Sequence, residues 1–168
     1  RRGTAVTGPP RRPARESGGP VWETGGAMEG LGQQGKVKQL GLSEVTGQEL
    51  ADAHSVHPIA AVQSEWSIWS RDVERNVVPA AAGLGVGFVP YSPLGRGFLT
   101  GPVDAATLGA NDFRRRIPRF AEDAADANQG VVATVRPVAA ELSATPALVA
   151  LAGLLADGTR PGLAAVPL

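Results

Sequence analysis

Polar side chains and one aromatic ring stand at the ends of three apolar segments of this sequence. Ser43 and Glu44 close the first segment, Gln63 and Glu65 close the second, and Tyr91 and Ser92 close the third. A side-chain amide donates and accepts hydrogen bonds at once, which suits a carboxamide ligand. A tyrosine ring offers a flat face on which a heterocycle stacks. These residue types together indicate a site for a polar heterocycle.

The third segment leads into the sequence SPLGRG, residues 92–97. Its glycines allow a ligand to approach the backbone N–H groups, and Arg96 adds a guanidinium, so the loop has the components of a diphosphate site. Each signal is weak by itself, because a tyrosine at a strand end is more often a packing residue. Their occurrence at three successive segment ends favours a ligand site.

Alternating apolar segments and helical patterns predict the elements that position these residues. Strands are predicted at residues 36–44, 59–67, 86–92 and 162–168. Helices are predicted at 21–35, 46–57, 71–85, about 129–142 and 146–157, with an irregular segment from 93 to about 128. Strands that alternate with helices predict a parallel sheet, whose carboxyl ends share one edge. The pattern leaves open a four-stranded doubly wound sheet and half of an eight-stranded barrel.

Local signals mark several helix ends. Thr46 followed by Glu49 predicts a capping box, and Thr145 before Pro146 predicts a capped helix start. Pro137 lies inside the predicted helix near residues 129–142, where an interior proline costs about 3 kcal/mol.

Composition excludes several classes of protein. The 168 residues contain 16 basic and 16 acidic side chains, so no net charge favours nucleic acid or anionic lipid. No apolar run is long enough to span a membrane. The absence of cysteine excludes disulfides and suits a reducing compartment, and we expect a cytoplasmic protein. The sequence does not begin with Met, as expected of a piece of a longer protein.

The N-terminal residues differ in composition from the rest. Residues 1–19 are rich in Pro, Gly and Arg, and we expect them to be a disordered or non-homologous segment. A basic arm that binds nucleic acid is the less favoured interpretation.

From residue 20 to its end, the sequence resembles the aldo-keto reductase family, whose members are NADP(H)-dependent (β/α)8 barrels. The resemblance is carried by GKVKQLGLSEV, by the stretch from HPIAAVQSEWS to PYSPLGRGFLTG, and by DFRRRIPRF. It is strongest to the bacterial and plant branch that reads GLSE, VQSEYS and PYSPLGRGFLTG. It implies an α/β fold, a partial (β/α)8 TIM barrel with strands 5–8 and their helices. Residues 20–168 are then the C-terminal half of the barrel.

The resemblance also implies roles for the strand-end residues. Ser43, Glu44 and Gln63 would bind the nicotinamide carboxamide, although many members have Asn where this sequence has Glu44. Tyr91 would stack on the nicotinamide ring. Ser92, Leu94 and Arg96 would lie along the diphosphate of NADP(H).

The family's catalytic groups have no counterpart in these residues. In the family, hydride passes from NADPH to a carbonyl, and a Tyr tuned by Lys and Asp protonates the oxygen while a His orients the substrate. Those groups come from the first four strands, and the only tyrosine here is Tyr91. No catalytic residue is therefore assigned.

Other charged clusters give weaker signals. His54 and His57 have no third ligand at a matching position, so no metal site is expected. Arg114, Arg115, Arg116 and Arg119 suit either a contact with the diphosphate or, as the favoured interpretation, a solvated basic loop.

The resemblance implies an NADP(H)-dependent oxidoreductase that reduces small aldehydes or ketones to alcohols, of which this chain carries the cofactor-binding wall. The alternative is a catalytically inactive half barrel that binds a nucleotide weakly or forms oligomers. A half barrel leaves two sheet edges unpaired, so we expect a dimer or an insoluble product. We expect no turnover by these 168 residues alone, and the sequence leaves the substrate and the NADP versus NAD preference open.

Overall fold

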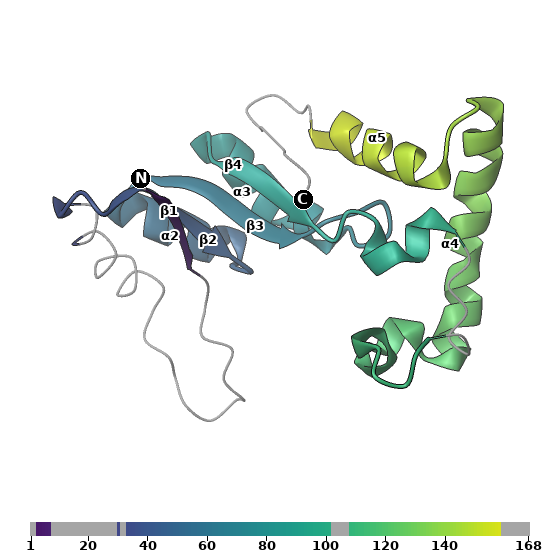
Figure 1. The fold of residues 1–168 in the computed structure, drawn as a ribbon. Coiled ribbons are helices and arrows are strands. Elements are labelled where there is room, and N and C mark those ends of the chain that lie inside the picture. Colours follow the sequence, from purple (N-terminus) through teal and green to yellow (C-terminus); the bar gives the residue numbers. More distant parts are fainter. Residues whose placement is uncertain (1–2, 8–29, 31–32, 102–107, 159–168) are drawn as a thin grey trace.

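A four-stranded parallel sheet forms the centre of the protein. The computed structural model describes residues 3–7, 30, 33–101 and 108–158. The strands are β1 (Gly3–Thr7), β2 (Val37–Ser43), β3 (Ile59–Glu65) and β4 (Gly87–Tyr91), and they lie side by side in that order (Figure 1). All three neighbouring pairs are parallel. The predicted α/β class with a parallel sheet is thus confirmed.

The strand order favours one of the two architectures that the sequence left open. A doubly wound sheet reverses its strand order at a switch point. The described strands follow the chain order β1-β2-β3-β4 without reversal. The same sequential order occurs in (β/α)8 barrels, in which each strand pairs with the next along the chain.

Two helices cover one face of the sheet. They are α2 (Gly47–Val56), between β2 and β3, and α3 (Val77–Leu84), between β3 and β4. Leu42, Val62 and Phe88 are neighbours across the sheet and are at most 1% exposed. They pack with Leu50 of α2 and Ala81 of α3 in the main hydrophobic cluster.

The other face of the sheet carries the next residue of each strand. Side chains alternate between faces along a strand. Ser43, Gln63 and Val89 are register partners one residue beyond the buried row, and each is partly exposed. This face is therefore the one on which polar strand-end residues reach solvent or a ligand.

A second group of elements lies beyond the carboxyl end of the sheet (Figure 1). Four of them are short 3-10 helices, namely η1 (Asp72–Arg75), η2 (Gly95–Thr100), η4 (Phe113–Arg116) and η5 (Pro118–Phe120). Two longer α-helices follow, α4 (Glu122–Glu141) and α5 (Pro146–Gly158). Phe98, Phe120 and Val132 form a separate hydrophobic cluster against which Trp69 packs. This cluster ties η2 and η5 to α4.

One expectation about the N-terminal segment is wrong. Residues 3–7 are not disordered but form β1, which pairs with β2 from Gly3↔Val37 to Thr7↔Leu42. The sequence Thr-Ala-Val-Thr has strand propensity, but the main-chain bonds to β2 are tertiary and do not show in local composition. The rest of the predicted segment lies outside the described residues.

The remaining elements follow the predictions closely. The strands predicted at residues 36–44, 59–67 and 86–92 are confirmed as β2, β3 and β4. The predicted helix 21–35 and final strand 162–168 lie largely or wholly outside the described residues. The predicted helix 71–85 is divided into η1 and α3, and α4 begins at Glu122 inside the segment expected to be irregular.

The helix-end predictions are confirmed. The Thr46 hydroxyl accepts from the N–H of Glu49 at 3.2 Å, and the Glu49 carboxylate accepts from the N–H of Thr46 at 2.7 Å. The Thr145 hydroxyl accepts from the N–H of Leu148 at 3.2 Å. Within the described ranges no single helix is long and apolar enough to cross a membrane; only Asn128–Glu141 and Pro146–Asp157 counted together, bent by 96°, have that length and composition.

Candidate functional site

Three of the predicted site residues share the solvent-facing side of the sheet at its carboxyl edge. Ser43 and Gln63 are direct register partners, and Tyr91 is the partner of Glu65, which lies two residues after Gln63. Residues two apart on a strand point to the same face. Ser43, Gln63 and Tyr91 therefore lie on one face, at the edge where the sequence predicted them.

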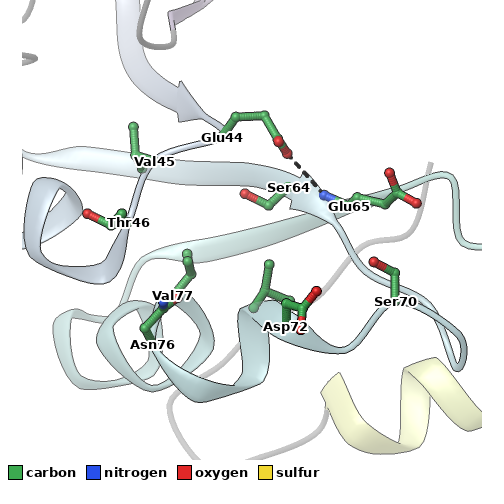
Figure 2. A pocket seen from close by; sticks show the side chains of 10 residues that line it. Glu44, Val45, Thr46, Ser64, Glu65, Ser70, Asp72, Asn76 and Val77 are labelled. Atoms are coloured by element: carbon green, nitrogen blue, oxygen red, sulfur yellow. Dashed lines mark hydrogen bonds between the residues drawn. The ribbon is translucent and has the colours of Figure 1, made fainter. Parts of the chain in front are cut away.

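Glu44 does not share the face of Ser43, Gln63 and Tyr91, because the chain turns sharply after β2. Its φ of 58° is in the left-handed region, which non-glycine residues adopt only at a cost. The turn is held by its N–H, which donates to the Gln63 carbonyl at 2.9 Å. The Glu44 carboxylate accepts from the N–H of Glu65 at 3.2 Å (Figure 2). Glu44 thus ties the ends of β2 and β3 together.

The loop after β4 has an unusual run of left-handed residues. Ser92, Gly95, Arg96 and Gly97 have φ values of 51°, 58°, 57° and 92°. The N–H of Gly95 donates to the Ser92 carbonyl at 2.8 Å. The Leu94 carbonyl accepts from the N–H groups of Gly97 and Leu99, both at 3.1 Å. Leu94 thus contributes its main chain to the turn.

Glycine is required at residue 95 for a second reason. A Cβ on Gly95 would lie 2.7 Å from a ring carbon of Trp69, a distance at which one of the two must move. Trp69 is stacked on Phe98 with ring centroids 4.5 Å apart. The loop therefore lies directly against the second hydrophobic cluster, which fixes the position of Arg96.

Arg96 is placed between the strand end and the loop. Its guanidinium donates to the Ser92 hydroxyl at 2.9 Å and lies 3.3 Å from the Glu65 carboxylate. The guanidinium carbon is 6.0 Å from the centre of the Tyr91 ring. A cation, a hydroxyl and an aromatic face therefore meet at the end of β4.

Glu65 was predicted at the end of the second strand but was assigned no role in the site. Its carboxylate binds Arg96 and also Arg119, the latter at 2.6 Å. The signal was present, since Glu65 follows Gln63 at strand spacing and so shares its face. No local pattern could indicate Arg119, because that residue lies 54 positions away along the chain.

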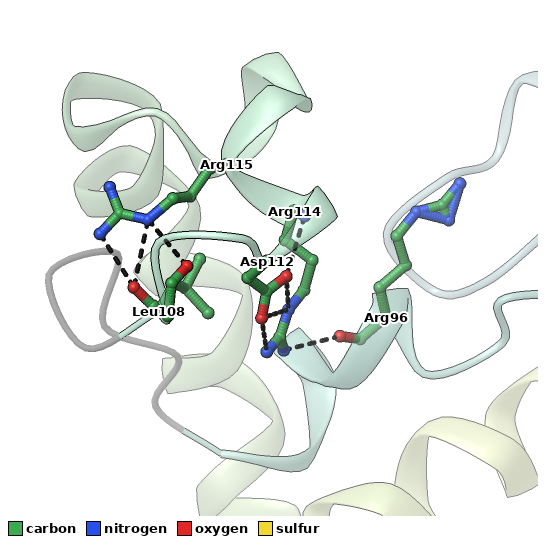
Figure 3. A network of polar contacts seen from close by, with 6 residues as sticks. Arg96, Leu108, Asp112, Arg114 and Arg115 are labelled. Carbon is green, nitrogen blue, oxygen red and sulfur yellow. Dashed lines mark hydrogen bonds and ion pairs between the residues drawn. The ribbon is translucent and has the colours of Figure 1, made fainter.

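The basic segment around η4 is largely paired. Arg114 donates to both carboxylate oxygens of Asp112, the shortest bond being 2.7 Å, and also to the Arg96 carbonyl at 3.3 Å (Figure 3). Hydrogen bonds from the Arg114 side chain and backbone lower the pKa of Asp112 to about 2. Arg115 donates to the carbonyls of Leu108 and Gly109. Arg114 and Arg119 are thus paired with carboxylates and only partly exposed, unlike the expected solvated loop. Arg115 and Arg116 are exposed, as that expectation has it.

Two hollows adjoin these residues. One of about 580 Å³ is bordered by the loop after β4 and the η4 segment, with Ser92, Arg96 and Arg114 among its lining residues. The other, of about 280 Å³, lies between the ends of β2 and β3 and the start of α3, and Glu44 and Ser64 line it (Figure 2). The predicted diphosphate residues Ser92 and Arg96 thus border the first hollow, while Glu44 borders the second.

The histidines take no part in this site. The Nδ1 atom of His54 accepts from the N–H of Ile59 at 3.2 Å, which connects α2 to β3. Among the residues that the structure describes, no three His, Cys, Asp or Glu side chains are arranged to hold a metal ion.

Comparison with solved structures identifies the fold. The chain superimposes on glycerol dehydrogenase from Gluconobacter oxydans with a TM-score of 0.80 at 20% identity, covering 99% of this chain and 49% of that one. A thermostable aldo-keto reductase, solved with the inhibitor epalrestat, matches with a TM-score of 0.59 at 28% identity, covering 88% of this chain and 44% of that one. The chain thus has the fold of part of these enzymes.

Sequence comparison identifies the family. The sequence model of the aldo/keto reductase family matches residues 11–166. "Probable aldo-keto reductase 1" of Glycine max is 43% identical over 139 residues, which are 83% of this chain and 40% of the soybean protein. The chain belongs to the aldo/keto reductase family, and it spans 40 to 49% of the length of these three relatives.

Proposed function

We propose that this chain forms the cofactor-binding wall of an NADP(H)-dependent aldo-keto reductase, built from strands 5–8 of the barrel. The main support is the placement of Ser43, Gln63 and Tyr91 on one face at the carboxyl edge of the sheet. Ligands of parallel α/β folds bind at this edge. The whole protein would reduce a small aldehyde or ketone to an alcohol.

The donor set fits the nicotinamide end of the cofactor. Ser43 and Gln63 lie next to each other across β2 and β3, and a hydroxyl and an amide together offer donors and acceptors for a carboxamide. Tyr91 is partly exposed on the same face, so its ring is available to stack on a nicotinamide. These residues would bind and orient the ring of the cofactor.

The loop after β4 fits the diphosphate. Ser92 and Arg96 line the hollow of about 580 Å³, and the Arg96 side chain is 23% exposed. A guanidinium with a neighbouring hydroxyl is a strong donor set for phosphate oxygens. Asp112 also lines this hollow, but Arg114 covers both of its oxygens, which offsets its repulsion of an anion.

Bound NADPH would supply a hydride, and this chain would hold the cofactor that delivers it. Tyr91 is the only tyrosine of the sequence, and we assign it to stacking and not to proton transfer. We therefore propose no catalytic acid among these residues. A catalytically inactive half barrel that retains only nucleotide binding is the alternative.

Titration of the chain with NADPH tests the proposal, with tryptophan fluorescence as the signal because Trp69 adjoins the loop that carries Arg96. We expect Tyr91→Phe to keep the Kd within about twofold, since the aromatic face remains, and Tyr91→Ala to raise it about tenfold, since a stacking contact contributes about 1–3 kcal/mol. Addition of an aldehyde should cause no oxidation of NADPH by this chain. Equal affinity of the Ala and Phe variants would contradict the stacking role.

A further inference from the structure

The Glu65 carboxylate forms ion pairs with two guanidiniums, at different distances. Arg119 approaches one oxygen at 2.6 Å, whereas Arg96 approaches the other at 3.3 Å. The Glu65 side chain is only 17% exposed. A carboxylate at this depth is strongly destabilising when it loses its last cationic partner.

Arg119 is fixed by contacts other than Glu65. Its guanidinium lies 4.9 Å from the Trp69 ring centre, within the range of a cation–π contact. Its carbonyl accepts from the side-chain amide of Asn128 on α4 at 3.0 Å. Trp69 is itself packed against Phe98 and Phe120. Arg119 therefore lies against the second hydrophobic cluster through Trp69, and this contact holds it beside Glu65.

Arg96 makes the longer contact with Glu65 and has a second acceptor. Its guanidinium divides its donors between Glu65 and the Ser92 hydroxyl, and it borders the hollow assigned to the diphosphate. An anion in that hollow would attract Arg96 away from its longer contact with Glu65. Glu65 would then keep Arg119 and would not be left unpaired.

We infer that Glu65 and Arg119 form a positioning pair that makes Arg96 available to the diphosphate of the cofactor. The inference rests on the proposed cofactor role of Arg96. Without Arg119, Glu65 would retain only Arg96 of these two guanidiniums, and an anion would have to break that ion pair before binding. Arg119 thus acts on the cofactor through Glu65, without contact with the cofactor itself.

Rescue by a second substitution tests this inference. The full chain carrying Arg119→Gln, Glu65→Gln or both is titrated with NADPH. We expect Arg119→Gln to raise the Kd about tenfold, which corresponds to a coupling within the usual range for charged neighbours. Glu65→Gln should bind within about threefold of the unsubstituted chain or more tightly. The double variant should return to that level, because Arg96 no longer has a carboxylate to neutralise.

A purely structural role predicts the opposite pattern. If Arg119 and Glu65 only stabilised the fold, the double variant would bind no better than Arg119→Gln, and that result would overturn the inference. Arg75→Gln is the matched control, since it removes one positive charge from η1, where the side chain is exposed, and should leave the Kd unchanged. Circular dichroism of each variant checks that the helices are retained.

A measurement without ligand separates this inference from the proposed function. Double-mutant cycles on urea unfolding, with Glu65→Gln and Arg96→Gln, give the Glu65–Arg96 coupling. We expect the coupling to be larger in the Arg119→Gln background than in the unsubstituted one. An unchanged or smaller coupling overturns the inference. If the coupling grows but the unsubstituted chain does not bind NADPH, the proposed function fails while the ion-pair exchange stands.

Discussion

Three of the residues assigned to the cofactor wall have a backbone conformation that favours glycine. Glu44, Ser92 and Arg96 have φ values between 51° and 58°. Such residues cost of order 1–3 kcal/mol each and persist only where surrounding contacts hold them. In Ser92 and Arg96 the strained turn brings a hydroxyl and a guanidinium within 2.9 Å of each other. The strained backbone of Ser92 and Arg96 thus places the two side chains that would bind the diphosphate next to each other.

The variant Ser92→Gly tests whether the Ser92 hydroxyl contributes to NADPH binding. Ser92→Gly relieves the left-handed conformation but removes the hydroxyl that accepts from Arg96. We expect NADPH binding to weaken about tenfold, because one hydrogen bond to a charged group contributes about 1.5 kcal/mol. Fluorescence titration measures the change.

Ser143→Gly is the control for that variant. Ser143 has a φ of 49° and is exposed between α4 and α5, away from the site. Its replacement should stabilise the chain by about 0.5 kcal/mol in urea unfolding, because relief of strain exceeds the added freedom of the unfolded chain. Its NADPH affinity should be unchanged. A loss of affinity equal to that of Ser92→Gly would remove the case for a role of the Ser92 hydroxyl.

At the scale of elements, α4 contains a proline that destabilises the helix. Pro137 lies inside Glu122–Glu141, where it lacks the N–H for the bond to the fourth preceding carbonyl and crowds that carbonyl. The side chain is exposed, so no packing contact of the ring offsets the cost. The helix persists because Val132 and Val135 on its other side are buried. Burial of this apolar side outweighs the local defect.

Replacing Pro137 by Ala should therefore stabilise the protein. We expect the free energy of unfolding to rise by about 1–3 kcal/mol, because an interior proline costs about 3 kcal/mol relative to alanine. Pro79→Ala is the matched control, since Pro79 is exposed in the first turn of α3, where the N–H has no partner within the helix. Urea unfolding should show little gain for the control. Equal effects of the two variants would show that α4 is not under strain at Pro137.

At the scale of the whole molecule, the described sheet has edges. β1 pairs only with β2 and β4 only with β3 among the described strands, and an edge strand offers unpaired main-chain groups to another chain. Apolar side chains are also exposed on the two last helices, namely Val138, Leu142, Leu148 and Leu155, which are 42 to 65% exposed. Both features favour association of the chain with a further protein surface.

Self-association is the expected result for the chain by itself. Two four-stranded parallel halves have the strand number of a closed eight-stranded barrel, in which no edge remains. We expect sedimentation velocity to show a dimer or larger species at micromolar concentration. Leu142→Gln, which removes a 65% exposed apolar side chain, should reduce non-specific aggregation without restoring a monomer. A monodisperse monomer that unfolds cooperatively would contradict this prediction.

Local signals in the sequence were sufficient for most elements. The strand ends at Ser43 and Tyr91, the capping box of Thr46 and Glu49, and the start of α5 at Pro146 were all predicted, because each depends on residues within a few positions. β1 and the early start of α4 were not predicted. β1 depends on a partner distant in the chain, namely β2.

The sequence by itself determined the α/β class, the family resemblance and the types of residue at the edge of the sheet, since these depend on periodicity, short motifs and side-chain chemistry. Only the tertiary structure decided that Ser43, Gln63 and Tyr91 share a face, because that follows from the register of three strands. It alone also brought Arg119 to Glu65 across 54 positions. Ion pairs of this kind form only after the chain has folded, so no local pattern of residues specifies them.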